Sequence, residues 1–266
     1  MASYIIKDMT KDNKQYGNEK GLSINHYLVK MVHNILKSVD QNTAAAKRAV
    51  ILTMLDYSQA FERQSHILGV QSFIDNNVRI SLIPTLISFF QNRKLAVKWK
   101  KFISSSKKVS GGGPQGGTAG ILEHISLTKG NLDFLQDEEG YKFVDDTSLL
   151  EVLNLLSIGL SSFNAKLEVP SDIPPEMKYI PPENTKTQDY IEKICEWTDL
   201  HQMKLNPTKT KFMVINFCQN YQFRTRLSLK NSLLGQIHQT KLLGVIIQDN
   251  LSWEENTKSL AKRANS

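Results

Sequence analysis

Apolar residues near the start of the chain recur at helical spacing. Ser23 is a suitable helix N-cap, and the apolar positions after it are Ile24, Leu28, Met31, Val32, Ile35, Leu36 and Val39. This three- and four-residue spacing predicts an amphipathic helix. Further helices are expected over residues 64–75, 81–91, 118–127 and 187–202. The polar and charged residues 7–20 are expected to form a loosely held lead-in.

Shorter apolar runs predict the strands. Residues 49–55 are almost continuously apolar up to Asp56, which is typical of a strand buried on both faces. Residues 95–100 alternate between apolar and polar positions, as a half-exposed strand does. Residues 141–153 place apolar side chains on both sides of Asp145-Asp146, which predicts a hairpin with the two carboxylates at its turn. Short strands are also expected at 211–217, 225–229 and 242–247.

Glycine and proline mark two stretches that interrupt these elements. Residues 110–117 are dense in glycine, and residues 170–186 contain five of the eight prolines of the chain. The proline-rich stretch is expected to form an irregular surface insertion. The sequence contains no internal repeat of the solenoid type.

Bulk composition is that of a globular protein with a basic excess. The chain has 266 residues, of which 40% are hydrophobic and 22% charged, so it can bury one large core or two modest ones. The formal net charge of +7 favours a polyanionic partner such as nucleic acid. Charge alone is a weak indication, because many basic proteins bind no nucleic acid.

The cysteines and the apolar stretches bear on the compartment. Cys195 and Cys218 fit neither a zinc spacing nor a redox pair, which favours two buried free thiols in a reducing compartment, cytoplasmic or nuclear. The first residues lack the apolar core of a signal peptide. No stretch approaches the length of a membrane span, so no membrane is expected among the partners.

Three aspartates form the candidate chemical centre. Asp56 ends a buried strand, and Asp145 and Asp146 lie in a second strand-like context. A carboxylate there is costly unless it is paired or binds a metal, and three together repel one another unless a divalent cation joins them. Oxygen-only ligands suit Mg²⁺ or Mn²⁺. The alternative from the residues alone is that these aspartates simply cap turns.

Five segments follow one another in an order that resembles a known set of catalytic motifs. They are Leu55-Asp56-Tyr57-Ser58-Gln59-Ala60-Phe61, Gly113-Pro114-Gln115-Gly116, Phe143-Val144-Asp145-Asp146, Leu205-Asn206-Pro207-Thr208-Lys209-Thr210-Lys211 and Leu243-Gly244-Val245. This set resembles the motifs of reverse transcriptases from non-LTR retrotransposons. Upstream, Gln15-Tyr16-Gly17 and Lys20-Gly21-Leu22-Ser23 resemble the segment that opens the long fingers helix of these enzymes. One such motif would be a weak signal, whereas the ordered set is specific.

The resemblance implies a fold and its parts. The fold would be α/β (α+β), a right-hand polymerase whose palm carries the aspartates on a small antiparallel sheet. Residues 1–48 would be partial fingers with the lead-in, and residues 49–257 the palm with an insertion near 170–186. Residues 258–266 would begin a thumb that is mostly absent. The first fingers motifs are expected before residue 1 and a full thumb after residue 266.

The resemblance also implies the reaction and its participants. The chain would be an RNA-directed DNA polymerase that adds dNTPs to the 3′-hydroxyl of a DNA primer on an RNA template. Asp56, Asp145 and Asp146 would hold two Mg²⁺ ions, for which Mn²⁺ is a possible substitute. In two-metal sites the ions lie about 3.5–4 Å apart and stabilise the attacking and leaving oxygens. Asp56 and Asp145 would be the more essential ligands.

Other residues receive roles from the same motifs. Tyr57, Phe61, Gln115 and Gly116 would bind the dNTP, with the Phe61 ring excluding a 2′-hydroxyl. Lys209, or alternatively Lys211, would act near the triphosphate as a general acid. Leu243 and Gly244 would form a hairpin that grips the primer end. The run of Lys94, Lys98, Lys100, Lys101, Lys107 and Lys108, with Trp99 and Phe102 between them, is expected either to follow a phosphate backbone or to form a solvated strand edge.

The sequence departs from the family pattern at a few positions. Glu62 stands where Asp is common, Gly111-Gly112-Gly113 replaces the usual run before the second motif, and Val144 stands where Ala is frequent. No endonuclease domain or zinc knuckle is recognisable. Two alternative functions remain: a catalytically inactive remnant of a retroelement that at most binds nucleic acid, and an RNA-directed RNA polymerase. Phe61 argues against the latter, because such an enzyme must admit a 2′-hydroxyl.

Overall fold

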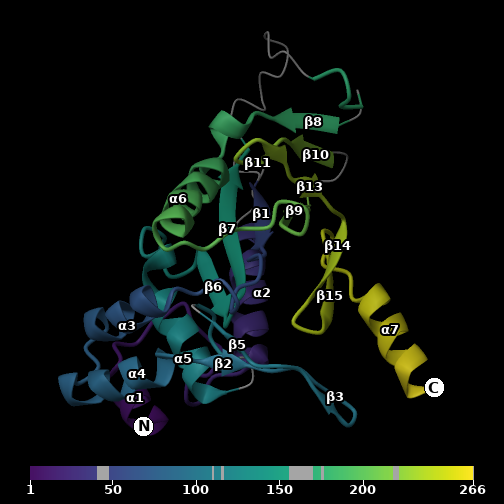
Figure 1. The fold of residues 1–266 in the computed structure, drawn as a ribbon. Coiled ribbons are helices and arrows are strands. Elements are labelled where there is room, and N and C mark those ends of the chain that lie inside the picture. Colours follow the sequence, from purple (N-terminus) through teal and green to yellow (C-terminus); the bar gives the residue numbers. More distant parts are fainter. Residues whose placement is uncertain are drawn as a thin grey trace.

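The computed structural model describes residues 1–40, 48–109, 111–114, 117–155, 170–174, 177–217 and 222–265 (Figure 1). Its helices are α1 (Ala2–Asp8), α2 (Ile24–Asp40), α3 (His66–Asp75), α4 (Ile83–Phe90), α5 (Thr118–Leu127), α6 (Lys186–Leu200) and α7 (Glu254–Ala264). Short 3₁₀ turns are η1 (Ile80–Leu82), η2 (Lys129–Leu132) and η4 (Pro182–Asn184). None of the described helices is long and apolar enough to cross a membrane.

The strands fall into one central sheet and several two-stranded ribbons. The sheet contains β1 (Arg48–Leu55), β6 (Gly140–Phe143), β7 (Asp146–Asn154), β9 (Lys211–Asn216) and β13 (Gly235–Gln236), in the order β13-β9-β1-β7-β6. The ribbons pair β2 (Lys94–Leu95) with β5 (Lys107–Lys108), β3 (Lys98–Trp99) with β4 (Phe102–Ile103), β8 (Met177–Ile180) with β10 (Gln222–Thr225), β11 (Ser228–Leu229) with β12 (Ser232–Leu233), and β14 (Gln239–Leu242) with β15 (Val245–Gln248).

Strand β1 is central because both of its faces are buried. Its alternate residues Ala49 and Ile51 pack in one hydrophobic cluster with Ile191 and Ile194 of α6. The residues between them enter a second cluster with Tyr27, Met31 and Ile35 of α2. Successive side chains of a strand point to opposite faces, so a continuous apolar run fits a strand covered on both sides. The expected buried strand at 49–55 is confirmed.

Most of the expected helices and strands are present. The structure confirms helices at 23–39, 64–75, 81–91, 118–127 and 187–202, the strand at 211–217 and the hairpin at 141–153. The single strand expected at 95–100 is instead divided between β2 and β3, which pair in two separate ribbons. The Val97 amide donates to the Ser104 hydroxyl at 2.9 Å instead of to a backbone carbonyl. A side chain that takes up a backbone N–H competes with strand pairing in this way.

Three further expectations need correction. The segment 225–229 is the end of β10 and the start of β11, not one strand, and 242–247 is a hairpin. The irregular insertion at 170–186 contains β8, which pairs in parallel with β10 and buries Tyr179 and Ile180. Proline cannot donate to a ladder, but residues 177–180 contain none. A strand whose partner lies far along the chain leaves little local pattern in the sequence.

Candidate active site

The three predicted carboxylates meet at one end of the central sheet. Asp56 follows the last residue of β1, and Asp145 lies in the turn that joins β6 to β7, where Asp146 begins β7. Leu55 of β1 pairs with Thr147 of β7 in antiparallel register. Residues next to a paired position remain neighbours, so the strand register brings Asp56 to the acidic hairpin turn. Residues far apart in sequence therefore converge as predicted.

The carboxylates influence one another electrostatically. Partial removal of solvent by the surrounding protein raises the pKa of Asp146 to about 6, and the charges of Asp145 and Asp56 contribute in the same direction. Partial burial also raises the pKa of Asp56, which Lys209 opposes and Asp145 reinforces. Like charges disfavour ionisation of their neighbours. The three groups thus form one electrostatic cluster that a cation would stabilise.

Asp56 is tied to the segment that carries Lys209. The Asn206 amide donates to the Asp56 carbonyl at 2.7 Å, and the Asp56 amide donates to the Thr210 hydroxyl at 3.2 Å. The Lys209 ammonium lies 4.0 Å from Asp56 Oδ2. Lys211, the alternative lysine, is exposed at the start of β9. Geometry favours Lys209 of the two, because its charge faces the cluster.

The acidic turn is held in an unusual backbone conformation. Val144 has φ of +58°, which costs roughly 1–2 kcal/mol for a side chain with a Cβ. The Gln15 side chain secures it, because Gln15 Oε1 accepts from the Val144 amide at 2.9 Å. Gly17 lies so close that an added Cβ would be 2.6 Å from the Val144 nitrogen. The lead-in therefore positions the turn that carries Asp145.

This docking overturns the expectation of a loosely held lead-in. The Tyr16 amide donates to the Lys142 carbonyl at 2.8 Å, and the Lys142 amide donates to the Lys14 carbonyl at 2.7 Å. Gln15 is fully buried. The buried Lys142 ammonium lies 2.5 Å from Asp12 Oδ2. The sequence did not reveal these positioning residues, because their polarity predicts a segment exposed to solvent. In the structure they are buried, since β6 supplies their polar partners.

The aromatic residue of the first motif lies against the glycine loop. The Phe61 ring packs on the His124 ring with centroids 4.9 Å apart. The Phe61 carbonyl accepts from the Gly113 amide at 2.8 Å, and the Gln64 carbonyl accepts from the Gly112 amide at the same distance. These bonds bring the start of the second motif to the end of the first. Gln115 and Gly116 themselves lie outside the described residues.

Two other predicted site residues have distinct surroundings. The Tyr57 side chain is buried in the core, where its hydroxyl accepts from Asn131 Nδ2 at 2.8 Å and burial raises its pKa to about 12. A dNTP contact at Tyr57 stays a prediction. Leu243 and Gly244 form the turn of the β14–β15 hairpin with φ of +47° and +92°. Two consecutive positive φ values are typical of a tight two-residue hairpin turn.

The donor chemistry at the cluster suits a hard divalent cation. Asp56 Oδ2 is buried and accepts no hydrogen bond from any described residue, which leaves an oxygen that a cation would satisfy. Over the described ranges, no three His, Cys, Asp or Glu side chains are grouped closely enough to hold a metal ion together. The donor types therefore suit Mg²⁺, but the carboxylates as placed do not form a closed metal site, so joint binding of a metal by Asp56, Asp145 and Asp146 is a proposal.

The chain is similar to a transposon polymerase. It is 24% identical over 254 residues to the probable RNA-directed DNA polymerase from transposon BS of Drosophila melanogaster. That match covers 94% of this chain and 25% of the relative, so the chain spans about a quarter of that protein's length. No protein-family model matches the chain.

The fold resembles that of telomerase. Apo telomerase from Candida tropicalis aligns with a TM-score of 0.53 and 13% identity over 95% of this chain and 38% of that one. The same enzyme truncated from its C-terminal domain aligns with a TM-score of 0.54 and 11% identity over 90% of this chain and 40% of that one. These structures show likeness of fold.

A buried polar cluster supports the glycine loop beside Phe61. Glu123 is fully buried, and neither of its carboxyl oxygens has a hydrogen-bond partner among the described residues. An added Cβ would lie 2.4 Å from Glu123 Oε1 at Gly69, and 2.5 Å from Gln64 Oε1 at Gly113. Only glycine fits at these two positions without displacing the cluster. Burial raises the pKa of Glu123 to about 8 and lowers that of His124 to about 4.

The Glu123→Gln variant is expected to remove a pH-dependent loss of stability. The folded protein keeps the Glu123 proton up to about pH 8, whereas the unfolded chain releases it near 4.5. Stability therefore falls as pH rises, by about 1 kcal/mol between pH 7 and 8. His124 is neutral in the folded protein and mostly neutral in the unfolded chain over this window, so it changes the loss by only about 0.1 kcal/mol. Urea unfolding at the two pH values measures the effect. A Glu123→Gln variant that loses as much stability as wild type between pH 7 and 8 would contradict it.

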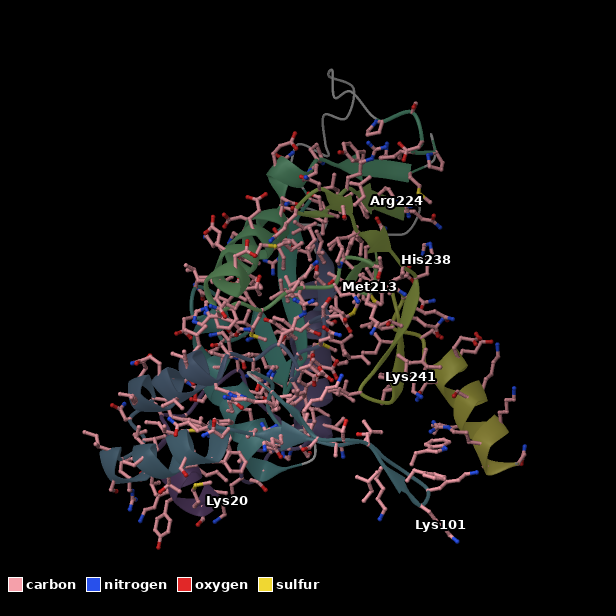
Figure 2. All side chains as sticks on the ribbon, in the orientation of Figure 1. Lys20, Lys101, Met213, Arg224, His238 and Lys241 are labelled. Carbon is pink, nitrogen blue, oxygen red and sulfur yellow. The ribbon has the colours of Figure 1, made fainter. Side chains whose placement is uncertain are left out.

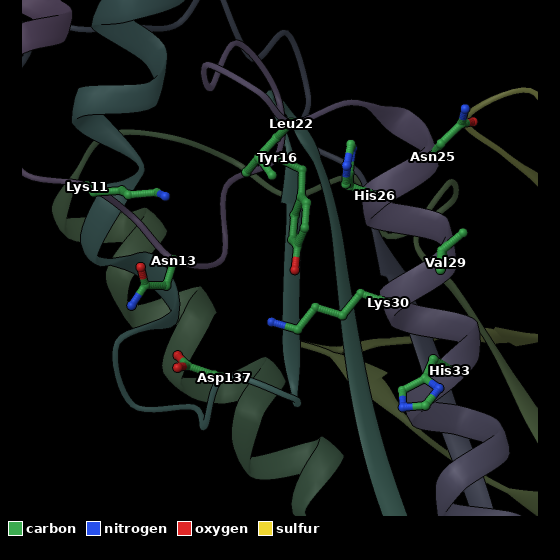
Figure 3. A pocket seen from close by; sticks show the side chains of 10 residues that line it. All are labelled: Lys11, Asn13, Tyr16, Leu22, Asn25, His26, Val29, Lys30, His33 and Asp137. Atoms are coloured by element: carbon green, nitrogen blue, oxygen red, sulfur yellow. The ribbon is translucent and has the colours of Figure 1, made fainter.

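A separate cavity of about 700 Å³ lies between the lead-in and α2 (Figure 3). Its walls include Lys11, Tyr16, His26, Lys30 and Asp137. In Figure 3 the Lys30 side chain extends toward Tyr16, and its ammonium lies 6.0 Å from the centre of that ring. None of the predicted catalytic residues lines this cavity. The candidate active site is therefore the open carboxylate cluster and not this cavity.

Proposed function

We propose that the chain is the catalytic core of an RNA-directed DNA polymerase of the retrotransposon type. The observation that carries the proposal is the meeting of Asp56, Asp145 and Asp146 at one end of the sheet, with Lys209 on Asp56. Phosphoryl transfer needs positioning and charge neutralisation more than covalent chemistry by the protein. Under this proposal the sheet end is the palm, residues 1–48 belong to the fingers, and α7 begins the thumb.

Each residue in the cluster has a chemical task in this proposal. Asp56 and Asp145, with Asp146, would hold two Mg²⁺ ions, which would supply charge to the attacking and leaving oxygens. Lys209 would neutralise, and donate a proton to, the leaving pyrophosphate. Phe61 would lie beneath the sugar of the dNTP, with its ring set by His124. The Leu243-Gly244 turn would hold the primer end against this centre.

Primer extension tests the proposal directly. The protein is incubated with an oligo(dT) primer on poly(rA), dTTP and Mg²⁺, and compared with the same mixture containing EDTA. Labelled DNA that lengthens only with Mg²⁺ is the expected result. If no extension occurs with Mg²⁺ or Mn²⁺ although the primer–template is bound, the polymerase proposal fails. The chain would then be a nucleic-acid-binding remnant.

Replacing Phe61 tests the assignment of sugar selection. Phe61→Ala removes the ring that would clash with a 2′-hydroxyl, so incorporation of rUTP relative to dTTP is expected to rise about 10-fold or more. Single-nucleotide incorporation kinetics measure the ratio. Phe134→Ala is the matched control, because Phe134 is a partly exposed phenylalanine packed against Tyr190 instead. Equal selectivity of Phe61→Ala and wild type would remove Phe61 from the nucleotide site.

A further inference from the structure

Positive charge is concentrated in one segment of the chain. Between Asp75 and Glu123 there is no acidic residue, and there are eight basic ones. The whole chain carries a net charge of +7, so the residues outside this segment carry a net charge of −1. The basic character of the protein therefore belongs to this segment and is not a general property of its surface.

Most of that charge lies on a projecting arm. Residues 94–108 form two successive antiparallel ribbons, β2 with β5 and then β3 with β4. Figure 1 shows the β3 end of this arm extending away from the rest of the protein. Six lysines lie on it: Lys94, Lys98, Lys100, Lys101, Lys107 and Lys108. No described acidic side chain forms an ion pair with any of them.

The arm is built unfavourably for an isolated hairpin. Lys94 pairs directly with Lys108, and like charges opposite each other in a ladder repel. A two-stranded hairpin is marginally stable in water even without such repulsion. An anionic partner would relieve the repulsion that the lysines impose on one another.

The tip of the arm also presents two aromatic rings to solvent. Trp99 and Phe102 are opposite each other in the β3–β4 ladder and are 71% and 78% exposed. Side chains opposite each other lie on the same face of a ribbon. The turn between them consists of Lys100 and Lys101, and Figure 2 shows Lys101 at the outer end of the arm. Two aromatic rings on one face beside lysines offer flat surfaces on which bases can stack.

We propose that residues 94–108 bind single-stranded nucleic acid. The lysines contact phosphates, and Trp99 and Phe102 stack on unpaired bases. Nucleic acid fits better than a protein partner, because it offers both a line of negative charge and flat apolar faces. A duplex hides its base faces, so the single strand is the preferred form. The inference deepens the proposed function, since a polymerase must hold an unpaired template, but its test requires no catalysis.

Salt-dependent binding tests the role of the lysines. Anisotropy of fluorescein-labelled oligo(rU) is measured with full-length protein over a range of NaCl concentrations. For Lys98→Gln/Lys100→Gln/Lys101→Gln, the slope of log affinity against log salt is expected to fall by about 2, because each lost phosphate contact lowers it by about 0.7. The control is Lys7→Gln/Lys20→Gln/Lys37→Gln, three exposed lysines that lie outside the arm. Equal slopes in both triple variants would overturn the proposal, as would wild-type protein that does not bind.

Aromatic substitution tests base stacking. Trp99→Ala/Phe102→Ala is expected to weaken oligo(rU) binding about 10-fold or more without changing the salt slope. Ile67→Ala/Ile80→Ala, which removes two equally exposed apolar side chains, is expected to bind normally. Circular dichroism checks that each variant is folded. If wild type bound a blunt duplex as tightly as oligo(rU), stacking on unpaired bases would be contradicted. If Trp99→Ala/Phe102→Ala lost a dimer that wild type forms but bound oligo(rU) normally, the two rings would belong to a protein interface instead.

The two proposals fail separately. Asp145→Asn leaves the arm intact, so it is expected to bind oligo(rU) like wild type. If wild type binds through the arm but extends no primer, the polymerase proposal alone fails. If primers are extended while both arm variants bind like wild type, the inference about the arm alone fails.

Discussion

Asp145→Asn is expected to abolish Mg²⁺-dependent primer extension, with a loss of at least about 10²–10³-fold in rate. The substitution preserves shape and removes one negative charge from the cluster formed with Asp56 and Asp146. That charge is what a divalent cation at this site would require. Asp145 lies at an exposed turn, so the thermal unfolding midpoint is expected to stay close to that of wild type.

The control for this experiment is the same Asp-to-Asn substitution at a position outside the cluster. Asp75→Asn replaces an exposed aspartate at the end of α3, where the carboxylate accepts a hydrogen bond from Gln71 at 2.8 Å. Extension by Asp75→Asn is expected to match wild type. Asp56→Asn is expected to behave like Asp145→Asn, because the two are the principal ligands in the proposal. An Asp145→Asn protein that retains more than a tenth of wild-type extension would exclude Asp145 from the catalytic centre.

Lys142→Met is expected to destabilise the protein by about 3–5 kcal/mol, as removal of one partner from a buried ion pair commonly does. The Lys142 side chain is 1% exposed, and its ammonium lies 2.5 Å from Asp12 Oδ2. It also donates to the Thr128 carbonyl at 2.9 Å and to Asn131 Oδ1 at 3.0 Å. Burial lowers the pKa of Lys142 and Asp12 opposes this, so the pair depends on both members.

Urea unfolding followed by circular dichroism measures this loss. The Asp12→Asn/Lys142→Met double variant is expected to recover part of it, because the aspartate is then no longer left as a buried unpaired charge. Lys241→Met serves as control, since Lys241 is an exposed lysine on β14 (Figure 2), and it is expected to change stability by less than about 0.5 kcal/mol. A Lys142→Met protein as stable as Lys241→Met would show that the pair is not needed.

The amino-acid sequence by itself determined the elements whose pattern is local. The apolar run before Asp56 predicted a strand covered on both faces, and helical spacing after Ser23 identified α2. The acidic pair with apolar flanks indicated the β6–β7 turn. These features depend on residues a few positions apart, so propensity and periodicity are sufficient to predict them.

Only the tertiary structure decided which distant residues support those elements. Gln15 looks like a solvated polar residue until β6 lies beside it, and Lys142 looks like a surface lysine until Asp12 lies 2.5 Å away. The pairing of β8 with β10 likewise depends on a partner outside the proline-rich stretch. A buried polar group is stable only when its partner is present, and that partner is set by the packing of the whole chain. The sequence placed the aspartates, and the packing around them decided how they are held.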